Sequence, residues 1–223
     1  MSFILYIIYA TAALALLVAV FLRFLARRSL GRLALCLVLF GLFWDNLILA
    51  LGNLIGAGPL LLALSLPRFW LHQLFLPWII LTAIEHAASG GAAWAEGRRA
   101  LVWGLVASLA LMVAGIMTRL VGLQLEPAVM DGVQRYVSLT RKGPPLVSIL
   151  GIGFLGVASF LGPRKRGWHW TWAFVALTFV IEGVPVEALR RGAGSAVELA
   201  LMGSLLAWDS RARDSLLRIQ TRA

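Results

Sequence analysis

Charge and cysteine are both scarce in this sequence. Charged residues make up 13% of the 223 and hydrophobic residues 61%, whereas a soluble domain carries roughly twice that share of charge. The only cysteine, Cys36, lies within an apolar segment, so an intrachain disulfide is excluded and redox chemistry is not expected. This composition indicates a chain that belongs in a lipid bilayer.

Metal and cofactor patterns are also missing. The three histidines, His72, His86 and His169, are too scattered for a multi-histidine haem or di-iron site. The run from Gly151 to Gly156 matches the pattern GxGxxG, but it stands inside an apolar segment with no strand before it. We interpret this run as a surface for helix packing, and we predict no metal and no cofactor.

Seven apolar segments fill most of the chain, and most of them reach the roughly 17–25 residues that a spanning helix needs. They cover residues 3–22, 33–55, 69–88, 101–118, 146–162, 168–186 and 194–208. The connections are too short for a soluble domain. We therefore predict an all-α polytopic membrane protein: a single seven-transmembrane-helix bundle over residues 1–209, followed by a basic amphipathic tail over 210–223.

The net charge of +10 is interpreted as a signal of membrane topology, and no nucleic-acid partner is expected. With the N-terminus outside, thirteen of the twenty basic residues lie on the inner side: Arg23, Arg27, Arg28, Arg32, Arg98, Arg99, Arg164, Lys165, Arg166, Arg211, Arg213, Arg218 and Arg222. The positive-inside rule then predicts an outside N-terminus and a cytoplasmic C-terminus, in a plasma membrane of bacterial type. An oligomer remains open.

Asp45 and Asn46 lie in the middle of residues 33–55, a stretch of 23 residues with no other charge. A carboxylate at that depth costs several kcal/mol, so it is expected to face a protein interior or a wet cavity. Gly52 and Gly56 fall on the same helical face as Asp45 and form a small-residue packing motif. This motif predicts that Asp45 faces neighbouring helices.

Prolines mark the start and the middle of the third predicted helix. The third helix is expected to begin near Ser65, with Pro67 in its first turn and a kink at Pro77. We interpret Glu85 and His86, at its inner end, as interfacial residues in reach of water.

The longest loop, residues 124–142, has hydrophobic residues spaced by four, at Leu125, Val129, Val133 and Val137. That spacing predicts a short amphipathic helix on the outer surface, placed as a lid.

The remaining polar residues fall at similar depths in the outer half of the bundle. Relative to their span centres, Glu182 and Glu198 lie roughly 5–6 Å toward the outer side, and Asn53 and His72 roughly 10–13 Å. This alignment predicts one cavity that opens outward. The predicted catalytic residues are Asp45, Glu182 and Glu198, with His72 as a proton relay. The predicted substrate-binding residues are Asn46, Asn53, Gln73, Trp44, Phe69, Trp70 and Trp78.

Three functions fit this pattern. Buried carboxyls next to aromatic rings, which stabilise cations, suit an intramembrane enzyme that acts by general acid/base chemistry on an isoprenoid or another membrane lipid. The same carboxyls could serve a small transporter or channel, or hold together a non-catalytic assembly or scaffold protein.

The layout of the whole chain resembles one known family. Its size, seven helices, short loops and buried carboxylates are similar to those of the small transmembrane terpene cyclases of meroterpenoid and indole-terpenoid pathways. No motif transfers residue roles from that family to this chain. The resemblance implies a protonation-initiated cyclase of an isoprenoid.

Overall fold

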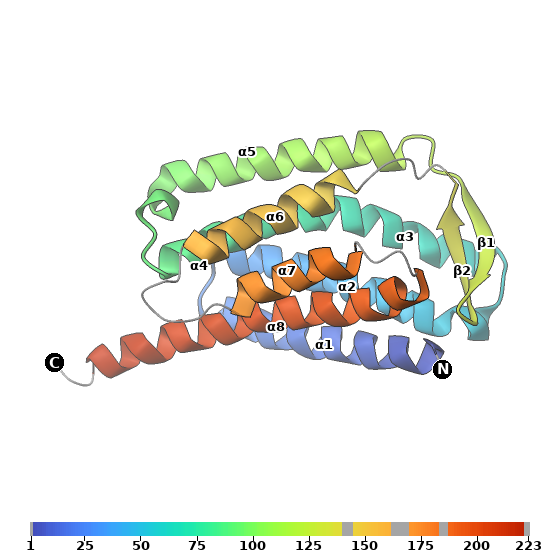
Figure 1. Cartoon of the computed structure of the whole chain (residues 1–223), viewed down its shortest axis with the longest axis horizontal. Helices are drawn as coiled ribbons and strands as arrows, with labels where there is room; N and C mark the ends of the chain where they lie inside the picture. Colours follow the sequence, from blue (N-terminus) through green and yellow to red (C-terminus); the bar gives the residue numbers. More distant parts are fainter. Residues whose placement is uncertain (1, 140–144, 162–169, 183–186, 221–223) are drawn as a thin grey trace.

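The computed structural model describes residues 2–139, 145–161, 170–182 and 187–220, and for residues 2, 187–191 and 210–220 it describes the backbone alone. Eight helices make up most of it (Figure 1): α1 Ser2–Ala26, α2 Leu30–Ile55, α3 Pro59–Phe75, α4 Ile79–Ser89, α5 Gly97–Gly115, α6 Leu146–Leu161, α7 Trp170–Glu182 and α8 Glu187–Gln220. Two strands, β1 Leu125–Met130 and β2 Val133–Ser138, form an antiparallel hairpin. Several predicted features lie outside the described residues: the span ends at 162, 168 and 186, His169, Arg164, Lys165, Arg166 and Arg222.

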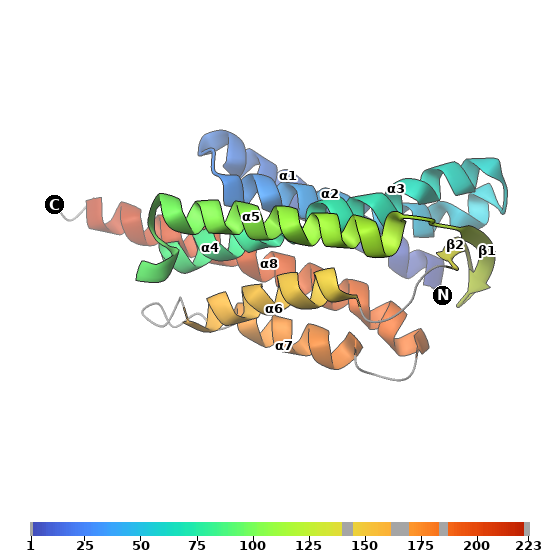
Figure 2. The same ribbon diagram turned by 90° about the horizontal axis from the view of Figure 1, so that it is seen from above.

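All seven predicted apolar segments overlap helices, because α3 and α4 together form the third. These helices run back and forth along the long axis of the molecule (Figure 1), so the N-terminus and the hairpin share one end and the C-terminus lies at the other. We name these the hairpin end and the C-terminal end. From above, α6 and α7 lie side by side along one edge (Figure 2). The backbone of α8 continues to Gln220, so residues 210–220 prolong the last helix.

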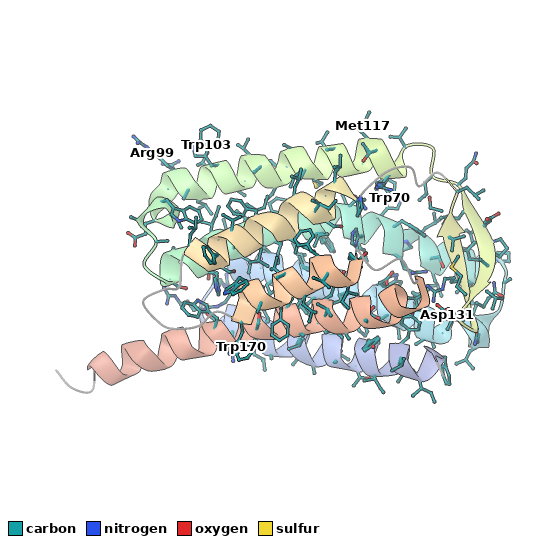
Figure 3. All side chains as sticks on the ribbon, viewed as in Figure 1. Trp70, Arg99, Trp103, Met117, Asp131 and Trp170 are labelled. Atoms are coloured by element: carbon teal, nitrogen blue, oxygen red, sulfur yellow. The ribbon has the colours of Figure 1, made fainter. Side chains whose placement is uncertain are left out.

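Four helical stretches are long and apolar enough to cross a membrane. They are Phe3–Ala26, Leu30–Ile55, Pro59–Ser89 and Gly97–Leu120, while α6 and α7 are apolar but shorter. Large apolar side chains cover the outside of these helices. Trp103 of α5 and Met117 of the π-helical turn that follows it, Ile116–Leu120, are 72% and 64% exposed (Figure 3). Water-soluble monomers rarely expose apolar surface on this scale.

The third helix begins earlier than the sequence predicts. Gly56, with φ of 74°, ends α2, and Pro59 occupies the first turn of α3 right after Gly58. Proline at the first helical position loses no hydrogen bond, which makes it a strong start signal. Ser65 is therefore a fully buried side chain within the helix and not its cap, and Pro67 also lies inside α3.

Pro77 interrupts the third helix, as predicted. A single 3₁₀ turn, Leu76–Trp78, separates α3 from α4. The buried Ser108 hydroxyl of α5 donates a hydrogen bond of 3.0 Å to the carbonyl oxygen of Pro77. A partner on a neighbouring helix therefore accompanies the break and joins α5 to it.

The long loop forms the β-hairpin, so the predicted amphipathic helix is wrong. Asp131 and Gly132 adopt positive φ angles of 53° and 76°, which two-residue hairpin turns require. Valines at 129, 133 and 137 favour strands, and a spacing of four residues fits the strand period of two as well as the helical one. The Asp-Gly pair is the local signal that decides between the two.

The hairpin packs on α2, which corrects the interpretation of the two glycines. A Cβ atom at Gly52 would collide with the backbone carbonyl oxygen of Gln134 in β2, so Gly52 admits a strand and not another helix. Gly56 has open space around it and serves as the helix C-cap. Asn53 fixes the same contact, because its amide donates to the Gly132 oxygen (2.7 Å) and accepts from the Gln134 nitrogen (2.6 Å).

The C-terminal end is closed by polar contacts between helices. The carboxylate of Glu85 accepts hydrogen bonds from the Ser29 hydroxyl (2.7 Å) and the Gly31 backbone nitrogen (3.0 Å), so it stabilises the N-terminus of α2. His86 is only 4% exposed, and its ring lies 4.8 Å from that of Trp208 in α8. The prediction that His86 lies in reach of water is therefore wrong.

Candidate functional site

Asp45 forms an ion pair with Arg68 between α2 and α3. Arg68 Nε of α3 lies 2.8 Å from Asp45 Oδ1 of α2, and the two side chains are 10% and 38% exposed. Sequence reasoning missed this partner because it placed Arg68 in the first turn of its helix. The start at Pro59, six residues earlier than predicted, carries Arg68 about 9 Å further along the helix, level with Asp45.

The guanidinium of Arg68 retains hydrogen-bonding capacity. Its Nη1 atom is buried and has no acceptor among the described residues. Its central carbon lies 5.8 Å from the ring centroid of Phe69. The ion pair is therefore flanked by an aromatic ring and keeps a free donor on the arginine side.

Two further carboxylates lie near Asp45. Glu198 of α8 interacts electrostatically with both Asp45 and Glu182. The Glu182 carboxylate lies against the backbone of α8, because a Cβ atom at Gly194 would be 3.3 Å from Glu182 Oε1. The three carboxyl groups predicted to act together thus come from α2, α7 and α8, and Glu198 is within electrostatic range of the other two. Glu182 is exposed, so the expectation that all three carboxyls are buried is wrong for this residue. Within the described ranges, no three potential metal ligands are grouped closely enough to hold an ion.

His72 and Gln73 lie on different faces of α3. His72 lies four residues after Arg68, so the two share a face of α3, and its Nε2 lies 3.1 Å from the Ser148 hydroxyl of α6. Gln73 packs against Gly115 of α5, and its buried Oε1 atom has no hydrogen-bond donor among the described residues. His72 therefore borders the carboxylate cluster from the α6 side, while Gln73 lies on a different face.

The two asparagines have separate surroundings. Asn46 is fully buried; its Nδ2 donates to the carbonyl of Leu42 at 2.8 Å, and its Oδ1 lacks a partner in the described part of the chain. Asn53 uses both amide atoms to hold the hairpin, as described above. Of these two predicted substrate-binding residues, Asn46 has a polar atom without a described partner, and Asn53 uses both of its amide atoms.

The four candidate aromatic residues differ in their exposure and contacts. Trp44, next to Asp45, donates its indole N–H to the Leu64 carbonyl at 3.2 Å, which locks the ring against α3. Trp78 is half-buried in the 3₁₀ turn, and Trp70 is 43% exposed (Figure 3). Trp44 and Phe69 therefore border the ion pair, whereas Trp70 forms part of the outer surface.

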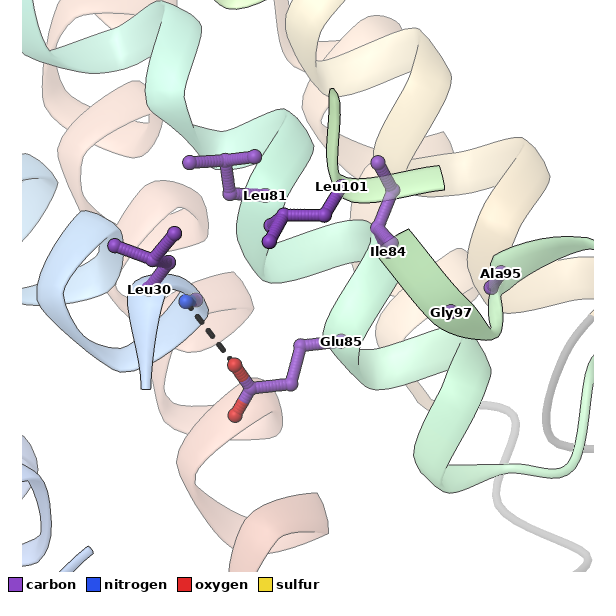
Figure 4. Close-up of a pocket in the computed structure, with 8 residues that line it drawn as sticks. Leu30, Leu81, Ile84, Glu85, Ala95, Gly97 and Leu101 are labelled. Atoms are coloured by element: carbon purple, nitrogen blue, oxygen red, sulfur yellow. Dashed lines mark hydrogen bonds between the residues drawn. The ribbon is translucent and has the colours of Figure 1, made fainter. Parts of the chain in front are cut away.

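Two pockets lie on the sides of the bundle. An apolar groove of about 360 Å³ runs between α6 and α7, lined by Gly153, Gly156, Val157, Phe160, Leu161, Trp172, Val175, Ala176 and Phe179. A smaller pocket of about 230 Å³ lies at the C-terminal end beside Glu85, between α2, α4 and α5 (Figure 4). The predicted outward cavity at Asp45 coincides with neither of these two pockets.

The groove and the carboxylates are related through α7. Trp172, Val175 and Phe179 line the groove at spacings of three and four residues, and Glu182 follows three residues after Phe179. Residues at this spacing share one helical face, so Glu182 continues the groove-lining stripe by one turn. The apolar groove thus leads along α7 toward the carboxylate cluster.

Comparison with known proteins assigns no function to this site. No family model matches the sequence, and no curated protein matches it either.

Proposed function

We propose that the chain is an integral membrane protein that crosses the bilayer seven times, with the hairpin end outside and the C-terminal end in the cytoplasm. Four helical stretches of sufficient length and apolar character, the exposed apolar side chains and the alternating helix directions support this arrangement. Arg23 and Arg32 lie at the C-terminal end, where both pair with Asp209. The positive-inside rule places that end in the cytoplasm. A plasma membrane of bacterial type is the proposed location.

Within this membrane protein we propose an enzyme site formed by Asp45, Arg68, Glu182 and Glu198. The observation that carries the proposal is the Asp45–Arg68 ion pair, with Glu198 within electrostatic range of Asp45. The cluster holds three carboxyl groups and one guanidinium. Within a bilayer such an excess of carboxyls favours retention of protons on those that lack a cation. Arg68 is the cation partner of Asp45, and we propose Glu198 as the proton donor.

The proposed chemistry divides the work between two carboxyls. Glu198 delivers its proton to an alkene or epoxide, the resulting cation forms a new carbon–carbon bond, and the Asp45 carboxylate removes a proton from the product cation. One proton enters and one leaves, so the net reaction is an isomerisation, and the proton returns from Asp45 to Glu198 before the next cycle. Trp44 and Phe69 border the pair and provide faces that stabilise a cation.

The groove between α6 and α7 supports a lipid-like substrate. Its volume of about 360 Å³ falls in the range of small-molecule sites, and its lining is almost entirely apolar. An isoprenoid chain that lies in this groove would have one end at Glu182. We therefore propose a protonation-initiated terpene cyclase, in agreement with the resemblance in layout.

Conversion of isoprenoids by membranes that contain the protein tests this function. The substrates are farnesyl- and geranylgeranyl-substituted lipids and their terminal epoxides, and isomeric products are separated by mass spectrometry. Glu198→Gln removes the proton and keeps the volume of the side chain, so turnover should fall by about 10²–10⁴-fold. Glu126→Gln, which changes an exposed carboxylate of the hairpin, should convert substrate like the wild type.

Equal turnover by wild type and Glu198→Gln would overturn the assignment of the acid. Another result would replace the proposed enzymatic function with transport. If no lipid is converted, but proteoliposomes take up protons in a manner that Glu198→Gln abolishes, then the same carboxyls serve transport.

A further inference from the structure

Arg135 is a buried cation at the hairpin end. It lies in β2, on the face of the hairpin that packs over α1 and α2, and the residue is only 8% exposed. Its Nη2 donates a hydrogen bond of 3.1 Å to the hydroxyl of Tyr6 in α1. The central carbon of the guanidinium lies 5.5 Å from the centroid of the same ring. Tyr6 is therefore the neutral partner of a charged group.

No carboxylate neutralises Arg135 among the residues that the structure describes. The other arginines that reach into the bundle differ in this respect: Arg68 pairs with Asp45, and Arg23 and Arg32 pair with Asp209. Removal of an ion from water costs several kcal/mol, and a cation–π contact returns only part of that. A buried guanidinium without a counter-charge thus indicates that an anion belongs beside it.

Two donors beside the guanidinium also lack acceptors. Arg135 Nε is buried and makes no hydrogen bond to any described residue. The Tyr6 hydroxyl accepts from Arg135, so its own proton is free to be donated, and no acceptor for it is found within the described ranges. Its neighbour Tyr9 differs, because the Tyr9 hydroxyl donates to the carbonyl oxygen of Gly192 at 2.9 Å. Arg135 and Tyr6 together offer a charge and two unused donors.

We propose that Arg135 and Tyr6 form an anion site that binds a phosphate group at the hairpin end of the bundle. The planar guanidinium binds phosphate oxygens through charge-assisted hydrogen bonds, and the phenol adds a second donor. The ligand carries a net negative charge: it is either the phosphate of an anionic lipid headgroup or free phosphate. The proposed topology matters only for the choice between these two ligands. It puts Arg135 at the outer surface of the bilayer, where headgroup phosphates lie.

Phosphate-dependent stability of the purified full-length protein tests the site. A ligand that binds only the folded protein raises the melting temperature. In one arm, the protein in a neutral maltoside detergent is titrated with inorganic phosphate against chloride at equal ionic strength. In the other arm, nanodiscs of phosphatidylcholine are compared with nanodiscs that also contain phosphatidic acid. A shift with inorganic phosphate indicates a site for free phosphate, and a shift only with phosphatidic acid indicates a lipid headgroup.

Variants tie the shift to this site. Arg135→Gln should abolish it, Arg135→Lys should retain part of it, and Tyr6→Phe should weaken the apparent affinity about tenfold. Arg99→Gln removes the same charge from an exposed position at the C-terminal end and should leave the shift unchanged (Figure 3).

Two results would overturn the site: no shift in either arm, or equal shifts for wild type and Arg135→Gln. If Arg135→Gln does not fold, Tyr6→Phe decides, and unchanged phosphate affinity in that variant would exclude the site.

Discussion

Arg68 of α3 holds the carboxylate of Asp45 of α2 at 2.8 Å across the interface of two antiparallel helices. The two residues lie at nearly equal distances along the chain from Ala57, in the turn that joins their helices. Helices that leave one turn in opposite directions bring such residues to the same depth. The pair thus follows from the position of the turn, and the turn follows from Gly56, Gly58 and Pro59.

A double-mutant cycle should show that this pair couples α2 to α3. Arg68→Met alone leaves the Asp45 carboxylate without its partner, so it should lower the free energy of unfolding by roughly 1–3 kcal/mol. Asp45 is partly exposed, which keeps the effect below that of a fully buried pair. The double variant with Asp45→Asn should lose less than the sum of the single losses. Unfolding in detergent by heat or denaturant provides the measurement, and strict additivity would contradict the coupling.

A glycine substitution in α2 should loosen the hairpin. Gly52→Ala places a methyl group against the carbonyl oxygen of Gln134, which is backbone and can move only with the strand. We expect a loss of about 1–3 kcal/mol and faster proteolysis in the β1–β2 turn. Gly58→Ala is the matched control, since that position has open space and an extended backbone. Its stability should stay within about 0.5 kcal/mol of the wild type. Equal effects of the two substitutions would refute the close approach of the hairpin.

The sequence predicted the helical segments well, because long apolar runs are their direct signature. The break at Pro77 was also predictable, since proline removes a backbone donor wherever it stands. A common site for Asp45, Glu182 and Glu198 stays a prediction from depth, because helices that cross one slab bring residues of equal depth to one level. These features depend on local chemistry or on a single geometric constraint.

The features that were missed depend on short signals or on long-range contacts. The hairpin was assigned as a helix because valines spaced by four residues fit both periods, although Asp131-Gly132 favours a turn. The Asp45–Arg68 pair was missed because the helix start was placed at Ser65 and not at Pro59. Nothing local to Gly52 distinguishes a glycine that admits a strand from one that admits a helix. That distinction requires the position of the hairpin in three dimensions.

Labelling of introduced cysteines should establish the topology. Asp131→Cys, in the exposed hairpin turn, should react with an impermeant maleimide in intact cells. Arg99→Cys, at the exposed start of α5, should react only after the membrane is permeabilised. The native Cys36 is buried and should remain unlabelled, so it serves as the background. Labelling of both introduced cysteines from the same side would contradict the proposed orientation.

The last prediction separates the structural role of Asp45 from its catalytic role. Asp45→Asn should reduce isoprenoid turnover by about 10²–10⁴-fold, because an amide cannot accept the proton of the product cation. It should also lower stability, since Arg68 is left inside the bundle without its counter-charge.

Adding Arg68→Gln removes that uncompensated charge and should restore part of the lost stability while turnover stays low. The two measurements are the melting temperature of the purified protein and product formation in membranes, with Glu126→Gln as the control. Recovery of turnover together with stability would show that Asp45 only supports the fold. Full turnover in Asp45→Asn would remove Asp45 from the reaction and leave the Glu198 assignment to be judged by its own variant.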